Sequence, residues 1–344
     1  MRVTIKHPCL ALLISLMVCL LCTMSGYAGT TLKFSHTDTQ RPFDSVMAGM
    51  SVVFKDVVER ETGGQIKVNF FPASQLGKER EVMEMLKMGG ADIVMIITEG
   101  TTVAFFPPME VLGIPFLYPS IDVAYKVMDG PFGRELKETM RKETGMRMIA
   151  TAAPGPARNF ATKKLVRTLE DLKGLRIRTM EHPAHQAMVK ALGASPTPIA
   201  AMEIYSSIQS GIVDGVELPY QAFLNLKCEE LIKNMIVDQH VFNQHFLFVN
   251  DKWFLSLPPD QQRAVLKAGA RSQVVGRSMV DLWEAAGADE LRAKGVQVYF
   301  PPEQELKRFR DLARPPVLAM LRQRIDKKWI DGILKAVEEA SKEQ

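Results

Sequence analysis

The 344-residue sequence predicts an α/β protein of two lobes, with a cleft between the lobes and a long helix that both lobes share. Three observations predict this fold. Segments with strand and helix periodicity alternate from Thr31 onward, which is typical of α/β sheets. A Pro-Gly-Pro sequence at 154–156 interrupts this alternation, and a second α/β unit follows it. A Pro-free, Ala-rich stretch at 260–291 then predicts a helix that is longer than most globular helices.

The first lobe is predicted to hold a largely parallel sheet, because its strands and helices alternate. Gly63 and Gly64 end its first helix, and Ile66, Val68 and Phe70 alternate with polar residues as a strand does. The predicted elements are a strand at 31–35, a helix at 44–60, a strand at 66–70, a helix at 78–88 and a buried strand at 92–97.

The second lobe is predicted to repeat this organisation. Gly211 ends its second helix, and the apolar segment that follows is predicted to be a strand. The predicted elements are strands at 158–162 and within 171–180, helices at 184–192 and 201–210, a strand at 212–218 and the long helix at 260–291.

The first 28 residues are predicted to be a cleaved secretory signal peptide. Arg2 and Lys6 precede an apolar run at 10–21, and small residues lead to a cleavage site after Ala28. The run is shorter than the ~20 residues that a membrane-spanning helix needs, so an uncleaved anchor is the less favoured alternative. We therefore expect a periplasmic protein.

Cysteine content and charge restrict the function further. Three of the four cysteines lie in the predicted signal peptide, which leaves only Cys228 and no internal disulfide. The formal net charge is only +4, and it falls when Arg2 and Lys6 are removed. This small excess argues against nucleic acid as a partner.

Residues 171–180, DLKGLRIRTM, contain two arginines that need an explanation. Leu175 and Ile177 alternate with Arg176 and Arg178, which predicts a strand with both guanidinium groups on one side. This side is either exposed to solvent or part of a binding site. Arg158, at the start of another predicted strand near the boundary between the lobes, favours a binding site for an anion, because arginine binds a carboxylate with two parallel hydrogen bonds.

Other constellations are weaker. Glu217 is either a partner of these arginines or an ordinary surface carboxylate. His182 and His185 have an HxxH spacing, but Pro183 disrupts the helix that would align them, so no metal site is predicted. The sequence contains no GxSxG, GxGxxG, P-loop or HExxH motif, so we expect no cofactor and do not favour an enzyme.

Five segments match a known pattern in order: FPASQLGKEREVMEMLKMGGADI from Phe71, IPFLY from Ile114, DLKGLRIR from Asp171, ALGASPTPIAAMEIYSSIQSGIVDGVELP from Ala191 and LPPDQQRAVLKAGA from Leu257. With these segments the chain resembles the DctP-type substrate-binding proteins of tripartite ATP-independent periplasmic (TRAP) transporters. The match covers essentially the whole chain after the signal peptide.

The resemblance implies a periplasmic-binding-protein-like fold and an extracytoplasmic receptor. Such a receptor captures a small organic acid and delivers it to the membrane permease subunits of a TRAP transporter. Carried over, the family's lobes comprise 29–154 with 243–282 (lobe I) and 155–242 with 283–344 (lobe II), after a signal peptide at 1–28. A receptor for another transporter or a chemosensor is the main alternative, and an exported enzyme is less favoured.

The resemblance also implies ligand contacts. The last arginine of DLKGLRIR, here Arg178, binds the ligand carboxylate in this family, and Arg158 faces the ligand. Sialic-acid binders and several dicarboxylate binders have asparagine at the position of Leu218, and sialic-acid binders often have phenylalanine at that of Ala201. These two differences favour a monocarboxylate with a less polar body. The chain is one residue longer than the common pattern between 92 and 107, which leaves open whether Glu99 points into the cleft.

The remaining expectations concern residues around these contacts. We expect Thr37, His36 and Tyr220 among the ligand contacts, with Glu217 and His240 behind them. Arg176 is interpreted as a solvated or lobe-supporting charge. We expect a monomer, with a dimer as the alternative, and an open form that dominates without ligand.

Overall fold

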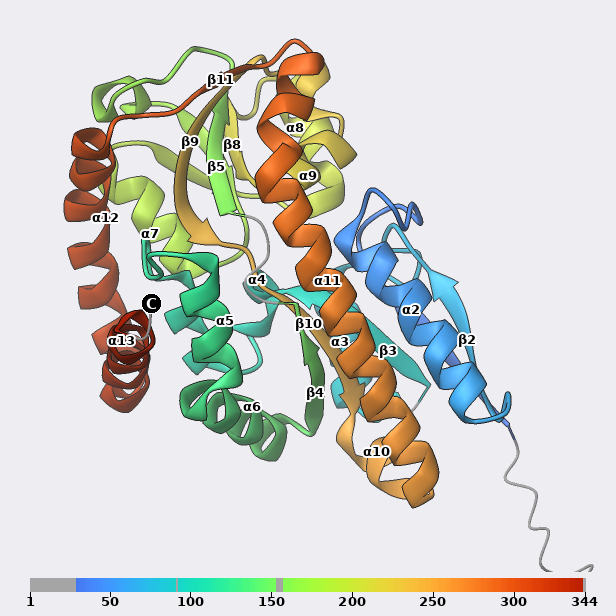
Figure 1. Ribbon diagram of the computed structural model, residues 1–344. Helices are drawn as coiled ribbons and strands as arrows, with labels where there is room; N and C mark the ends of the chain where they lie inside the picture. The colour runs from blue at the N-terminus through green and yellow to red at the C-terminus, as the bar shows by residue number, and fades with distance from the viewer. Residues whose placement is uncertain (1–28, 91, 153–156, 343–344) are drawn as a thin grey trace, which may run out of the picture.

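The computed structural model describes residues 29–90, 92–152 and 157–342 (Figure 1). The predicted signal peptide at 1–28 and the Pro-Gly-Pro sequence at 154–156 lie outside the described residues. Two separate sheets form the centres of two lobes, and helices cover both. The two-lobed α/β fold is therefore confirmed.

Lobe I is built on a five-stranded sheet with the order β2-β1-β3-β10-β4. β1 pairs in parallel with β2 and β3, as predicted, whereas β10 is antiparallel to both β3 and β4. The strands are β1 (Thr30–Ser35), β2 (Ile66–Phe71), β3 (Ile93–Thr98), β4 (Met146–Thr151) and β10 (His245–Asn250). The helices are α2 (Val46–Glu61), α3 (Glu79–Lys87), α4 (Glu99–Thr102), α5 (Ile121–Asp129), α6 (Pro131–Thr144) and α10 (Asp251–Ser256).

Local sequence explains why these elements begin and end where they do. The Ser45 side chain accepts a hydrogen bond from the Ala48 N–H and caps α2. Gly63 and Gly64 adopt φ values of 56° and 79°, which stop the helix where the sequence predicts. β3 has strands on both sides and its residues 93–97 are buried, so its sequence is continuously apolar.

Lobe II is built on a six-stranded sheet with the order β11-β9-β5-β8-β6-β7. This sheet is mixed: β6 is parallel to β7 and β8, but β5 is antiparallel to β8 and β9. The strands are β5 (Ala157–Thr162), β6 (Arg176–Thr179), β7 (Ser195–Pro198), β8 (Gly215–Leu218), β9 (Asn234–Phe242) and β11 (Gln297–Tyr299). The helices are α7 (Pro183–Ala191), α8 (Ile204–Gln209) and α9 (Tyr220–Asn225).

The antiparallel strands arise where the chain passes between the lobes. β9 ends in the sheet of lobe II, and β10 begins in the sheet of lobe I after Asn243 and Gln244. β10 follows β9 directly across the lobe boundary, with no helix between the two strands. Asn243 and Gln244 therefore lie between the two sheets.

The long helix α11 (Pro259–Ala293) is shared by both lobes, as predicted. It packs against α2 and β4 of lobe I and against α9 and β11 of lobe II, and Figure 1 shows it crossing the whole molecule. Two glycines allow this close packing. A Cβ at Gly276 would lie 2.5 Å from the Ala152 Cβ, and one at Gly287 would lie 2.6 Å from the Tyr220 ring.

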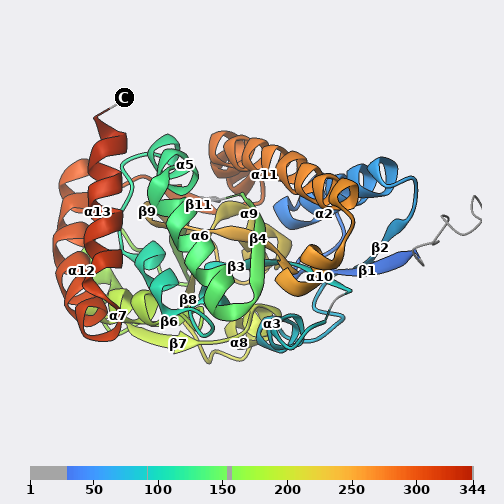
Figure 2. The same cartoon turned by 90° about the horizontal axis from the view of Figure 1, so that it is seen from below.

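Two C-terminal helices connect the lobes on the side opposite α11. α12 (Glu303–Arg324) packs against α7, and α13 (Lys327–Ser341) packs against α5 and α6 (Figure 2). The Trp329 ring contacts Phe106 and Phe132 edge-on. One apolar core runs continuously from β3 and α5 through α7 to α12 and α13. The exact limits of the two lobes along the chain stay a prediction.

Candidate ligand-binding site

A cavity of about 250 Å³ lies between the lobes. Lobe I contributes the segment after β1, one residue of α2, the end of β3 and the first turns of α3 and α4, and lobe II contributes β5, β6, β8, α8 and α9. Among the lining residues are Thr37, Asp38, Met47, Glu79, Thr98 and Thr101 from lobe I, and Arg158, Arg178, Met180, Ile199, Ala201, Leu218 and Gln221 from lobe II.

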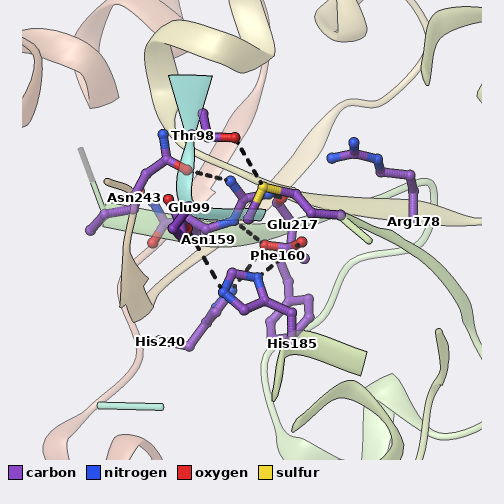
Figure 3. A network of polar contacts seen from close by, with 12 residues as sticks. Thr98, Glu99, Asn159, Phe160, Arg178, His185, Glu217, His240 and Asn243 are labelled. Carbon is purple, nitrogen blue, oxygen red and sulfur yellow. Dashed lines mark hydrogen bonds and ion pairs between the residues drawn. The ribbon is translucent and has the colours of Figure 1, made fainter. Parts of the chain in front are cut away.

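Arg178 is a buried cation at the surface of this cavity. Only 4% of the residue is exposed, and its Nε and Nη2 donate to the Ile199 carbonyl oxygen at 2.8 and 2.6 Å. Among the described residues, no carboxylate lies within ion-pair distance of its guanidinium, which stands apart from the neighbouring network in Figure 3. Burial, together with the charge of Arg158, lowers the pKa of Arg178 to about 10, so it remains cationic at neutral pH.

Arg158 lies in the same cavity but is fully engaged with the protein. Its Nε donates to the Glu217 carboxylate, its Nη2 to the Glu217 carbonyl oxygen, and its Nη1 to Asn243 Oδ1 at 2.7 Å. Asn243 comes from the connection between β9 and β10, so these bonds join lobe II to the lobe boundary. Arg158 thus supplies positive charge to the cavity while its side chain is held in place.

Glu217 organises a fully buried polar network behind the cavity (Figure 3). Its carboxylate lies 3.5 Å from His240 Nε2 and 3.7 Å from His185 Nδ1, and His240 Nδ1 lies 2.7 Å from Asp238. Burial opposes ionisation of Glu217, but Arg158, His185 and His240 outweigh it and hold its pKa well below the usual value. Glu217 and His240 are thus buried and do not line the cavity, and their role behind the ligand contacts stays a prediction.

Arg176 differs from Arg178 although the two share a strand. Its guanidinium is half exposed and makes a bidentate pair with Asp214, with Nε and Nη2 at 2.9 and 2.7 Å from the carboxylate. The interpretation of Arg176 as a solvated, lobe-supporting charge is confirmed.

The structure places three other candidates at the cavity and three behind its wall. Thr37, Ala201 and Leu218 line the cavity. Glu99, His36 and Tyr220 are buried and absent from its surface. Local contacts explain their positions. Glu99 Oε2 accepts the Gln244 N–H at 2.7 Å and so points toward the lobe boundary.

His36 and Tyr220 are held away from the cavity by their own neighbours. His36 Nε2 lies 2.8 Å from Gln40 Oε1. The Tyr220 ring packs onto Gly287 of α11, where the absent side chain leaves room for it. Both residues therefore support the walls of the site from outside.

Several cavity residues were not predicted from the sequence. Asp38, Glu79 and Glu81 add three carboxylates from lobe I, and Met47 and Met180 add apolar surface. Glu79 begins α3, where an acidic residue is ordinarily explained by the helix dipole. Its position in the cavity depends on the other lobe, so no local signal distinguishes it.

The structure also bears on metal ligation and membrane insertion. The rings of His182 and His185 stack at 4.6 Å instead of converging on an ion. In residues 29–90, 92–152 and 157–342, no group of three or more His, Cys, Asp or Glu side chains is arranged to hold a metal. No helix in the same residues is long and apolar enough to cross a membrane.

Comparison with known proteins identifies the family. Residues 36–323 match the family described as bacterial extracellular solute-binding protein, family 7 (DctP). The chain belongs to this solute-binding family. This chain is 33% identical over 271 residues to a solute-binding protein of Verminephrobacter eiseniae. The alignment covers 79% of each chain.

Solved structures agree with this assignment. A TRAP periplasmic solute-binding protein of Bordetella bronchispeptica, whose ligand density is interpreted as pantoate, has a TM-score of 0.81 and 28% identity. The match covers 89% of this chain and 99% of the Bordetella bronchispeptica chain. A second such protein, from Polaromonas sp. JS666, is bound to D-erythronate and has a TM-score of 0.81, 28% identity and coverage of 89% and 98%. The resemblance to TRAP receptors is thus confirmed.

Proposed function

We propose that this protein is a periplasmic receptor that binds the carboxylate of a small organic acid at Arg178 and delivers the acid to the permease of a TRAP transporter. The observation that carries the proposal is the buried guanidinium of Arg178, which lines the cavity and bonds only to a carbonyl oxygen. A carboxylate is the ligand that matches the planar guanidinium, because it accepts two parallel charge-assisted hydrogen bonds.

The rest of the cavity favours a monocarboxylate with a less polar body. The side chains of Leu218 and Ala201 offer no hydrogen bond, and Met47 and Met180 add flexible apolar surface. Two of the solved relatives carry pantoate or D-erythronate in their structures, and both compounds are small monocarboxylates.

Export and delivery complete the proposal. A signal peptide at 1–28 would place the receptor in the periplasm, where its relatives are described. A membrane permease would then receive the acid from outside the bilayer. The proposal includes no catalytic step, and an unchanged acid recovered after long incubation with the protein would support binding without turnover.

A thermal-shift screen of the mature protein against mono- and dicarboxylates, sugar acids, aromatic acids and keto acids tests the proposal. A ligand at a hundredfold excess over its Kd adds about 2.7 kcal/mol to stability. We expect a carboxylate to raise Tm in the wild type and not in Arg178→Ala. Arg176→Ala is the matched control, because Arg176 lies on the same strand but pairs with Asp214.

Two results would contradict the proposed function. One is that no acid shifts the wild type. The other is a shift that survives in Arg178→Ala, which would place the carboxylate away from Arg178; if that shift is lost in Arg176→Ala, the ligand binds at the Arg176–Asp214 pair instead.

A further inference from the structure

A second cavity, of about 350 Å³, lies at the outer edge of lobe I and shares no lining residue with the interlobe cavity. β4 is the edge strand of the lobe I sheet, and it runs between α6 and α11 (Figure 2). These three elements form the walls of the cavity. The lining residues are Arg134, Lys137, Glu138 and Arg141 of α6, residues 147–151 of β4, and Gln273 of α11.

The lining side chains of α6 share one face of the helix. Lys137, Glu138 and Arg141 follow Arg134 by three, four and seven residues, which is the spacing of neighbours on a helix surface. Arg147 adds a further cation from β4. The lining thus contains four cations and one carboxylate.

Two of the four cations are neutralised by carboxylates. Arg141 donates to Glu138 through Nε and Nη2 at 2.8 and 2.6 Å. Its Nη1 donates to Asp251 at 2.7 Å, and Arg147 Nε donates to the same carboxylate at 2.7 Å. Glu138 and Asp251 therefore balance the charges of Arg141 and Arg147.

The charges of Arg134 and Lys137 are not balanced in this way. Arg134 Nη1 donates to the Asp129 carbonyl oxygen at 2.6 Å, and Lys137 Nζ donates to the Met128 carbonyl oxygen at 3.0 Å. Among residues 29–90, 92–152 and 157–342, no carboxylate lies within ion-pair distance of either side chain. The Asp129 carboxylate pairs with Arg277 instead, at 2.6 Å.

Lys137 is also partly removed from solvent. Burial lowers its pKa, and Asp129 opposes this shift. The charges of Arg277 and Arg134 lower the pKa further. The cavity therefore holds two positive charges that no carboxylate of the described residues compensates.

Gln273 adds a neutral donor on the opposite wall. Its Oε1 accepts the Thr151 N–H at 2.9 Å, which fixes the orientation of the amide and leaves Nε2 to donate. α11 also approaches the Ile149 carbonyl at Gly269, where a Cβ would lie 2.6 Å from that oxygen. These contacts occupy backbone groups of β4 that an added strand would need, so the cavity favours a small ligand.

We propose that this cavity is a second anion site, which binds a small divalent oxyanion between Arg134, Lys137 and the Gln273 amide. Two uncompensated cations match a charge of two, and hydrogen bonds between ionised partners are the strong ones. Sulfate-like ions and dicarboxylates share this chemistry. The inference does not depend on the proposed function, because the two cavities share no lining residue.

A nuclear magnetic resonance titration of the isotope-labelled protein with sulfate, malonate and acetate tests the proposal. Sodium chloride holds the ionic strength constant. We expect sulfate or malonate to shift the Thr151 amide and the Gln273 side-chain amide along a saturable curve. Acetate carries one charge and should bind at least about tenfold more weakly. The tighter of the two divalent ions tells whether the site prefers a tetrahedral oxyanion or a dicarboxylate.

Four variants locate the site. Gln273→Glu keeps an oxygen that can accept the Thr151 N–H but places a negative charge beside the anion, so its Kd should rise at least about tenfold. Lys137→Gln should also raise the Kd, because it removes one of the two uncompensated charges. Lys335→Gln removes a charge from the exposed surface of α13, outside the cavity, and should leave the Kd unchanged. Arg178→Ala should leave it unchanged as well.

Three results would overturn the proposal. The first is that the shifts of these amides grow linearly and never saturate. The second is a Kd that is the same in wild type, Gln273→Glu and Lys137→Gln. The third is an equal rise of the Kd in Lys137→Gln and Lys335→Gln, which would show general screening of surface charge. Failure of the acid screen at Arg178 would not touch this site.

Discussion

Arg158 and Arg178 lie in one cavity but in different electrostatic surroundings. Arg158 is neutralised by Glu217 and fixed by Asn243, whereas Arg178 bonds only to the Ile199 carbonyl. A charged pair is stronger where water is excluded, so a carboxylate bound at Arg178 gains from closure of the lobes around it. The cavity thus holds one arginine that is engaged with the protein and one that is available to a ligand.

His240 predicts a pH dependence of stability. Burial alone would lower its pKa, but Asp238 and Glu217 outweigh burial and raise it to about 9. Its unfolded value is about 6.5. The imidazolium therefore contributes its full stability below pH 6.5, and this contribution is lost as the pH rises through 9.

Urea unfolding measures this effect. Between about pH 6.5 and 9.5, the wild type should lose up to about 3 kcal/mol more unfolding free energy than His240→Gln. Asp238→Asn removes the nearer carboxylate and should also weaken the pH dependence. Identical pH profiles for all three proteins would show that His240 carries no shifted charge.

The sequence predicted Arg178 as a site residue but did not predict the lobe I carboxylates that line the same cavity. The alternation in DLKGLRIRTM predicted a strand that presents Arg178, and the structure puts this residue in the cavity. Glu79 and Asp38 were missed because each has an ordinary local explanation, one at a helix start and the other beside the Ser45 cap. Only the approach of lobe II shows that they line a cavity.

At the scale of elements, α11 is the part that fixes both lobes to one frame. It runs for 35 residues and packs on helices of both lobes. At Gly276 it approaches lobe I so closely that a Cβ would lie 2.5 Å from the Ala152 Cβ and 2.8 Å from Met50 Sδ. Glycine lowers helix propensity, so its presence here is explained by packing.

Gly276→Ala separates these two effects. Helix propensity alone would stabilise the protein by about 1 kcal/mol. The collision with Ala152 should reverse the sign and destabilise it by about 1–3 kcal/mol. Chemical denaturation provides the measurement, and Ala270→Gly on the exposed face of α11 is the control that reports propensity alone. A stabilised Gly276→Ala would refute the close-packing explanation.

The sequence predicted elements with clear periodicity and did not predict those whose pairing is long-range. β1, β2, β3, α2, α3, α7 and α11 follow from local patterns. β9 carries Asp238 and His240 at buried positions, where His240 contacts both Asp238 and Glu217. These polar residues hide the apolar pattern of a central strand. The mixed direction of the lobe II sheet likewise depends on where the chain crosses between lobes.

At the scale of the whole molecule, several contacts cross the cleft. Gln221 of lobe II donates to Asp38 of lobe I, and Lys78 of lobe I pairs with Glu203 of lobe II. These contacts are few and partly exposed, so they contribute little on their own. A ligand that touches both lobes adds the missing attraction, which is the thermodynamic basis for ligand-dependent closure.

The most direct test of this account is a crystal structure of the protein with the acid that the thermal-shift screen identifies. The account predicts both carboxylate oxygens within hydrogen-bond distance of the Arg178 guanidinium, between the two lobes, with Arg158 still bound to Glu217. An acid bound outside the cavity, or bound inside it with its carboxylate turned away from Arg178, would contradict the account.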